Sequence, residues 1–129
     1  MLPDGTVDPV YKQQLQQVIG MLRAAGHDVF CSLEHANWQL GGLTDPAEEF
    51  RTDLAQIDTA DRLVVLLEER ISAGIQIELG YSYAKGKELD VYQIGKPAWS
   101  NTSFLALANT PIKPVNDIES FIKLLSAVY

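Results

Sequence analysis

Apolar residues at helical spacing predict the first element of the chain. They are Tyr11, Leu15, Val18 and Leu22, and they lie between Asp8 and Gly26. Asp8 followed by proline is typical of a helix start, and a glycine such as Gly26 is typical of a helix end. We therefore expect a helix from Asp8-Pro9 to Gly26.

Four short segments predict strands. The stretch from His27 to Leu33 is interpreted as a short strand. Leu63–Leu67 is a continuous apolar run, which is typical of a strand covered on both faces in a parallel sheet. Leu89–Ile94 predicts a third strand. Ile112–Val115 follows one proline and contains another, so it predicts a short edge strand.

Helical patterns separate and follow these strands. Asp45-Pro46 starts a helix after a loop at Gly41-Gly42, and its apolar stripe is Phe50, Leu54 and Ile57. Further helices are expected over Ser72–Lys85, ending at Gly86, and around Ser103–Ala108. The closing helix has Ile118, Phe121, Ile122 and Leu125 on one face.

The alternation of helices and strands predicts an α/β fold with an open, mostly parallel sheet flanked by helices, as in flavodoxin-like or Rossmann-like proteins. Doubly wound sheets of this kind begin with a strand that lies near the middle of the sheet. This chain begins with a helix, so we expect the usual first strand to be lacking.

Length and charge limit the kinds of function. The chain has 129 residues, which predicts a single domain over residues 1–129. A net charge of −7 disfavours a nucleic-acid surface, and no apolar run is long enough to cross a bilayer. The single cysteine, Cys31, forms no internal disulfide, which favours a cytoplasmic protein.

The chemistry is expected beyond the carboxyl ends of the strands, where open α/β sheets bind ligands. Ser72 and Gly74 begin a helix there, and small residues leave its first N–H groups open to an anion or a sugar hydroxyl. Glu78 lies about one and a half turns further along. Taken alone, Glu78 is equally well explained as a surface glutamate and as a site residue. For Ser72 the simpler interpretation is a plain N-cap.

Asp53 is a second candidate carboxylate, with a solvated helix residue as the equal alternative. Two carboxylates on one sugar suit glycosidic chemistry, one as nucleophile and one as acid or orienting group. His35 and Trp38 share a segment after the first predicted strand. Trp38 is placed to stack on a base, although packing is the commoner role of a tryptophan.

Other kinds of site are disfavoured. His27, His35 and Cys31 stand at spacings that fit no zinc site, and the glycines form neither a P-loop nor a dinucleotide fingerprint. We expect Cys31 to be a buried small side chain, not a nucleophile. We expect no metal and no cofactor.

The segments together resemble the nucleoside 2-deoxyribosyltransferase family. The resemblance rests on Asp53-Leu54, Asp61, the apolar strand, Ser72-x-Gly74-x-x-x-Glu78-Leu79-Gly80-Tyr81 and Lys85-Gly86-Lys87. It implies that Glu78 is the nucleophile that attacks the anomeric carbon and forms a covalent glycosyl-enzyme intermediate. It implies that Asp53 positions or protonates the leaving base, and it adds Gly74 and Tyr81 to the substrate-binding residues.

One position resembles a branch of that family. Transferases of free nucleosides carry an aspartate six residues before the nucleophile, where this chain has Ser72. A serine there is similar to the 2′-deoxynucleoside 5′-monophosphate N-hydrolases, in which this position contacts phosphate. Leu33-Glu34-His35 also resembles that branch, and Ser103 matches a phosphate-contacting serine that is contributed across a dimer interface. The resemblance thus implies a homodimer or a higher homo-oligomer acting on a small nucleoside or nucleotide.

Family members open with a strand and a glycine loop that form one wall of the pocket, and this sequence begins near the end of that loop. The leading hypothesis is an enzyme that cleaves the N-glycosidic bond of a nucleoside 5′-monophosphate or transfers its sugar. The alternative is a non-catalytic nucleotide-binding or regulatory protein with the same fold. A third is an α/β interaction domain with an accidental motif.

Overall fold

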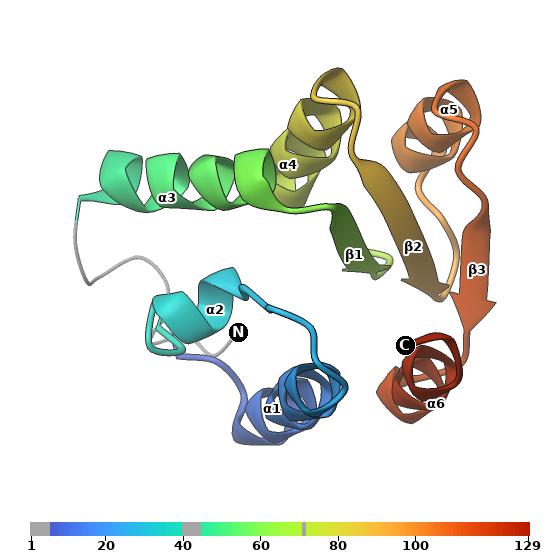
Figure 1. The fold of residues 1–129 in the computed structure, drawn as a ribbon. Coiled ribbons are helices and arrows are strands. Elements are labelled where there is room, and N and C mark those ends of the chain that lie inside the picture. The colour runs from blue at the N-terminus through green and yellow to red at the C-terminus, as the bar shows by residue number, and fades with distance from the viewer. Residues whose placement is uncertain (1–5, 40–44, 71) are drawn as a thin grey trace. The chain divides into compact units, whose positions relative to one another are not determined.

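A computed structural model describes residues 6–39, 45–70 and 72–129 (Figure 1). By its internal contacts the chain divides into two compact units, each described by itself. The second unit is Leu54–Phe121, and the first holds the residues before it together with Ile122–Tyr129. The predicted loop at Gly41-Gly42 lies outside the described residues, and the single domain stays a prediction.

The second unit is built on a parallel sheet of three strands in the order β1-β2-β3. Its strands are β1 (Arg62–Leu67), β2 (Glu88–Ile94) and β3 (Ile112–Val115). In the register Val65 pairs with Val91, and Gln93 pairs with Pro114. The three strands predicted here are confirmed, and so is the α/β fold with a parallel sheet flanked by helices.

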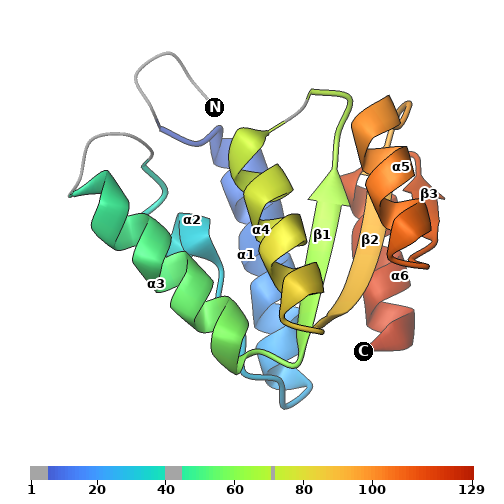
Figure 2. The ribbon, with the colours of Figure 1, turned by 90° about the horizontal axis from the view of Figure 1, so that it is seen from above.

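Two helices, α4 (Ala73–Ala84) and α5 (Trp99–Leu107), cover one face of this sheet (Figures 1 and 2). Between them and the sheet lies an apolar core made of Val65, Leu67, Leu79, Val91 and Leu105. Burial of each such side chain contributes about 1.5–3 kcal/mol, so this core fixes α4 on the sheet. The helix α5 was expected near Ser103 and begins four residues earlier.

The opposite face of the sheet carries a buried charge. Asp90 is 8% exposed, and its carboxylate accepts hydrogen bonds from the Tyr92 hydroxyl (3.0 Å) and from Lys113 Nζ (2.9 Å). The Tyr92 ring stacks edge-on against Phe121, with centroids 5.0 Å apart. A buried carboxylate needs such partners, because its desolvation would otherwise cost several kcal/mol.

Capping residues set the helix ends where the sequence predicts them. The Asp8 carboxylate accepts the Val10 N–H (2.8 Å) at the start of α1 (Pro9–Ala24). Gly26 (φ 95°) and Gly86 (φ 71°) follow the last turns of α1 and α4, where a left-handed residue lets the chain leave the helix. These starts and stops are confirmed.

The predicted strand from His27 to Leu33 is wrong. Residues 27–31 pair with no described strand, and a short helix, α2 (Ser32–His35), includes the last two residues of the segment. The Val29 carbonyl, a possible ladder acceptor, instead receives a hydrogen bond from the Arg23 guanidinium (3.0 Å). The alternating apolar side chains still face inward, against a cluster of Val7, Ile19 and Trp38. The alternating apolar residues correctly predicted which side of the segment is buried. They could not predict whether a neighbouring strand is present to pair with it.

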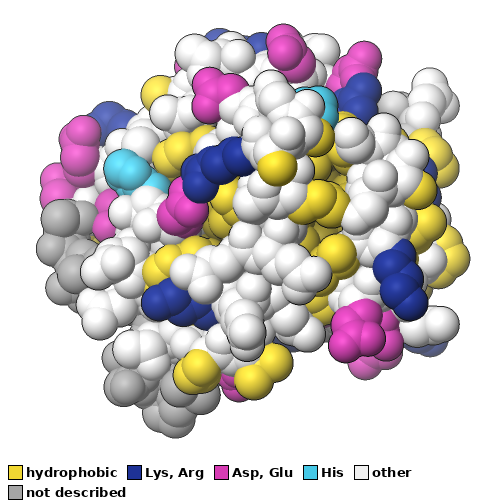
Figure 3. Space-filling view, turned by 60° about the horizontal axis from the view of Figure 1, so that its bottom comes forward, with side chains coloured by type: hydrophobic (Ala, Val, Ile, Leu, Met, Phe, Trp, Pro, Cys, Tyr) yellow, Lys and Arg dark blue, Asp and Glu magenta, His cyan; other side chains and the backbone are white. Residues whose placement is uncertain are grey.

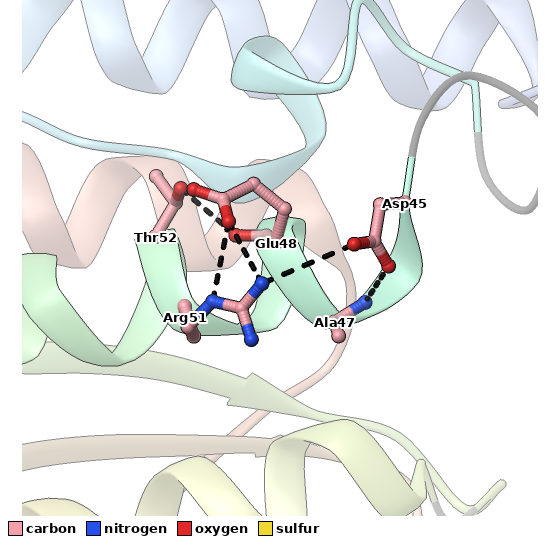
Figure 4. A network of polar contacts seen from close by, with 5 residues as sticks. All are labelled: Asp45, Ala47, Glu48, Arg51 and Thr52. Carbon is pink, nitrogen blue, oxygen red and sulfur yellow. Dashed lines mark hydrogen bonds and ion pairs between the residues drawn. The ribbon is translucent and has the colours of Figure 1, made fainter.

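The helix α3 (Pro46–Thr59) starts as predicted at Asp45, whose carboxylate accepts the Ala47 N–H (3.0 Å; Figure 4). One turn further along α3, the Glu48 carboxylate accepts a hydrogen bond from the Arg51 guanidinium (2.8 Å). The last predicted helix is α6 (Ile118–Val128), and its expected apolar face is buried at Phe121, Ile122 and Leu125.

Candidate functional site

The loop after β1 leads into α4 through Ser72. The serine has extended backbone angles, and its Oγ accepts the Ile75 N–H at 3.4 Å. Ser72 is exposed and Gly74 is half-buried. The predicted N-cap is therefore confirmed, and the first turn of α4 presents N–H groups at the carboxyl edge of the sheet.

Glu78 lies in the second turn of α4 and is half-buried. Its neighbour Leu79 is buried in the core (1% exposed), whereas Ile77 on the other side is 53% exposed. Glu78 thus occupies the border between the packed and the open side of the helix. Six residues separate it from Ser72, which corresponds to about 9 Å along the helix axis. That separation allows one ligand to contact the helix start at one end and the carboxylate at the other.

The Tyr81 hydroxyl is engaged within the protein. It donates to Asp58 Oδ1 at 2.6 Å, and Lys85 Nζ lies 3.5 Å from the same oxygen. The hydrogen bond to Asp58 raises the pKa of Tyr81, and it is the main reason why the pKa of Asp58 is lowered. Lys87 Nζ donates to the Asp58 carbonyl (2.9 Å). This cluster ties α4 to the end of α3 and gives Tyr81 a structural role.

Two amide side chains join α4 to α5. The Gln76 amide donates to Asn101 Oδ1, and Asn101 is only 2% exposed. Ser103 is exposed on α5, two residues further on. At the carboxyl end of β2, Gln93 is 1% exposed, and its Oε1 has no hydrogen-bond partner among the described residues. Sequence reasoning missed these three amides, and the one signal available was the position of Gln93 within an apolar strand.

The loops that follow β1 and β2 are tied to each other. Glu69 Oε1 accepts the Lys96 N–H at 3.0 Å. Gly95 has φ 76°, and a Cβ built on it would lie 2.7 Å from Glu69 Cγ. Only glycine combines this backbone angle with such a close approach. Sequence reasoning missed this link, although a glycine directly after a strand was a signal for it.

Asp53 and His35 belong to the first unit. Asp53 is half-buried on α3. Burial raises the pKa of Asp53, while nearby His35 opposes that rise and Glu49 adds to it. His35 is exposed, and its ring lies 5.5 Å from the Phe30 ring. A carboxyl that holds its proton more tightly than usual is suited to protonating a leaving group.

Trp38 is packed inside the first unit. It is 7% exposed and forms a cluster with Val7 and Ile19. Its φ of 61° is unusual for a bulky residue, and Lys12 Nζ lies 5.7 Å from the ring centroid. Little of the ring is left to stack on a base, which favours the packing alternative.

Of the predicted residues, Gly74, Glu78 and Tyr81 lie on α4 with Ser72 as its N-cap, and Ser103 lies on α5. Within the described ranges, no three His, Cys, Asp or Glu side chains group as metal ligands. Of the helices in the described part of the chain, none is long and apolar enough to cross a membrane.

Comparison with solved structures identifies a protein of the same fold. The CMP N-glycosidase of Clostridium botulinum matches with a TM-score of 0.68 and 19% sequence identity, over 88% of this chain and 90% of that one. No curated protein matches the chain in sequence. The sequence model of the nucleoside 2-deoxyribosyltransferase family matches residues 6–103, which is more than half of the 129 residues. The chain therefore belongs to the nucleoside 2-deoxyribosyltransferase family.

Proposed function

We propose that the protein cleaves the N-glycosidic bond of a nucleoside 5′-monophosphate, with Glu78 as the nucleophile. The observation that carries this proposal is the half-buried carboxylate of Glu78 on α4, beyond a helix start capped by Ser72, in a member of this family. A carboxylate beside apolar neighbours is poorly solvated, which favours attack on an electron-poor carbon.

In the proposed reaction Glu78 attacks C1′ of the sugar while the bond from C1′ to the base nitrogen breaks. The bonding electrons leave with the base, which takes a proton from Asp53. Water then attacks C1′ of the glycosyl ester, releases the Glu78 carboxylate and returns a proton to Asp53. A second base in place of water would give sugar transfer. The raised pKa of Asp53 supports its role as the acid.

Ser72 supports a phosphorylated substrate and hydrolysis. An aspartate at this position would repel a phosphate, whereas a serine at a helix N-terminus accepts one. The structural neighbour from Clostridium botulinum acts on CMP, which makes CMP and its deoxy form the first substrates to test. Gly74 is proposed to line the same subsite, and His35 to lie near the base.

We propose that two copies associate through the outer face of α4 and α5. Four large apolar side chains on these helices are exposed: Ile77 (53%), Tyr83 (45%), Trp99 (82%) and Leu107 (68%). The whole chain carries −7, and Glu78 is the one charged residue within α4 and α5, so two copies meet with little charge repulsion on this face. Ser103 follows Trp99 by one helical turn on α5, and it is proposed to enter the partner's site. A cytoplasmic location is also proposed.

The test is base release measured by chromatography, with CMP, dCMP and the other nucleoside 5′-monophosphates, then with nucleosides plus an acceptor base. Glu78→Gln keeps the shape of the side chain and should lower base release by about a thousandfold or more. Glu119→Gln removes an exposed carboxylate in the first turn of α6 and should change nothing.

Two results would contradict the proposal. If the wild type binds CMP and releases no base, the non-catalytic nucleotide-binding alternative is correct. If it neither binds nor cleaves any nucleotide or nucleoside, both functions are refuted. Intact mass spectrometry during turnover should show the glycosyl adduct on the wild type and none on Glu78→Gln.

A further inference from the structure

Most cations of this protein have a partner. The sequence has ten Lys and Arg residues, all within the described ranges, and Figure 3 shows several of them beside Asp or Glu side chains. Seven of the ten contact a carboxylate, a carbonyl oxygen or an aromatic ring, and these are Lys12, Arg23, Arg51, Arg62, Lys85, Lys87 and Lys113. Ten minus seven leaves Arg70, Lys96 and Lys123, whose side chains make no such contact with any described residue.

Two of these three unpaired cations lie at one end of the sheet. Arg70 is in the loop after β1 and Lys96 is in the loop after β2. Both strands run parallel, so both loops leave the same, carboxyl edge. The hydrogen bond from the Lys96 N–H to the Glu69 carboxylate (3.0 Å) joins the two loops directly, and Arg70 is the next residue after Glu69. The link therefore holds the backbones that carry both cations close to each other.

We infer that Arg70 and Lys96 form the cationic part of a subsite for the 5′-phosphate of the substrate. This inference rests on the proposed function and adds the residues that would recognise the phosphate charge. Guanidinium and ammonium groups bind phosphate oxygens through charge-assisted hydrogen bonds, and Ser72, two residues after Arg70, adds a hydroxyl. Glu68 and Glu69 lie beside them, so the two cations offset local negative charge as well as that of the ligand.

The cations at the two edges of the sheet differ in whether a carboxylate neutralises them. The Glu69 carboxylate accepts a hydrogen bond from the backbone N–H of Lys96 and not from its ammonium group, which stays free. At the amino edge of the same sheet, by contrast, the Arg62 guanidinium is paired with the Glu88 carboxylate (2.5 Å). One edge of the sheet thus has its cation neutralised, and the other presents two cations with no carboxylate partner among the described residues.

The test compares three variants with the same change in net charge. Arg70→Gln and Lys96→Gln remove the proposed phosphate contacts, and Arg62→Gln is the control at the opposite edge of the sheet. With CMP as substrate, each of the first two should raise KM by about five- to tenfold and change kcat little, because an exposed charge-assisted contact contributes about that much. Activity on cytidine, which lacks the phosphate, should be the same in all four proteins.

Equal effects of Arg62→Gln and Arg70→Gln would overturn the inference, because they would reflect overall charge alone. A wild type that cleaves CMP and cytidine with equal kcat/KM would also overturn it, while leaving the proposed function intact. Phosphorus NMR with inorganic phosphate tests binding without catalysis. The wild type should broaden the phosphate signal, and the double variant R70Q/K96Q should not. No broadening by the wild type, or equal broadening by both, refutes the subsite even if no base is ever released.

Discussion

Replacement of Gly95 by alanine should destabilise the protein by more than its backbone angle explains. Alanine at φ 76° costs about 1–2 kcal/mol, because its Cβ approaches the following carbonyl oxygen. The new Cβ would lie 2.7 Å from Glu69 Cγ, so Glu69 has to move. Its movement removes the hydrogen bond to the Lys96 N–H, which is worth about 0.5–1.5 kcal/mol. The expected total is about 1.5–3.5 kcal/mol.

Gly86→Ala is the matched control. Gly86 has nearly the same backbone angle, φ 71°, and a Cβ built there meets no atom within 4 Å. This substitution should therefore cost the backbone term alone, about 1–2 kcal/mol. Urea unfolding of both variants measures the two free energies of unfolding on one scale, with the slope confirming that the unfolded states are alike.

Removal of the Glu69 side chain should abolish the difference between the two glycines. In a Glu69→Ala background the close contact is absent, so Gly95→Ala and Gly86→Ala should cost the same. Equal costs in the wild-type background, or unequal costs in the Glu69→Ala background, would refute the link between the two loops as the source of the difference.

Three further predictions concern charged groups. Burial raises the pKa of Asp53, so the folded state binds its proton more tightly than the unfolded chain and loses stability as pH rises through the interval between the two pKa values. Asp53→Asn should therefore raise the free energy of unfolding measured with urea at neutral pH by less than about 1 kcal/mol after solvent screening, and the gain should vanish below the pKa of an unfolded Asp, about 3.9. Tyr81→Phe removes the hydrogen bond to Asp58, so the pKa of Asp58 should rise toward its usual value in an NMR titration, with KM for CMP changed by less than about twofold. A KM about tenfold higher would show that the hydroxyl contacts substrate. Lys113→Met leaves the Asp90 carboxylate buried without its cation and should cost about 1–3 kcal/mol in urea unfolding, and adding Asp90→Asn should recover most of that loss.

Local signals predicted the helix ends well. Asp8 and Gly26 bound α1, and Gly86 ends α4, because capping involves atoms within a few residues of each other. The apolar runs likewise predicted all three strands of the sheet. The segment from His27 to Leu33 failed because pairing depends on a neighbouring strand, about which an alternating pattern says nothing.

For the candidate site, too, local features were predicted from the sequence and long-range contacts were not. Ser72 and Glu78 were found because they belong to a short contiguous motif on one helix. The contact between Glu69 and Lys96 spans 27 residues, and no local pattern predicts which two loops meet. Tyr81 belongs to the motif as well, yet its hydroxyl is bound to Asp58, 23 residues earlier in the chain. A motif gives the position of a side chain, and long-range packing decides what that side chain touches.

The two outer strands of the sheet differ in their capacity to take on another strand. β3 has only four residues, one of them Pro114, and short edge strands with proline resist further pairing. β1 has six residues, is mostly apolar and contains no proline, and among the described residues it pairs with β2 alone. The two edges of the sheet are therefore not equivalent. An extra strand, whether from a fused segment or from a second molecule, has a suitable edge at β1 and a poor one at β3.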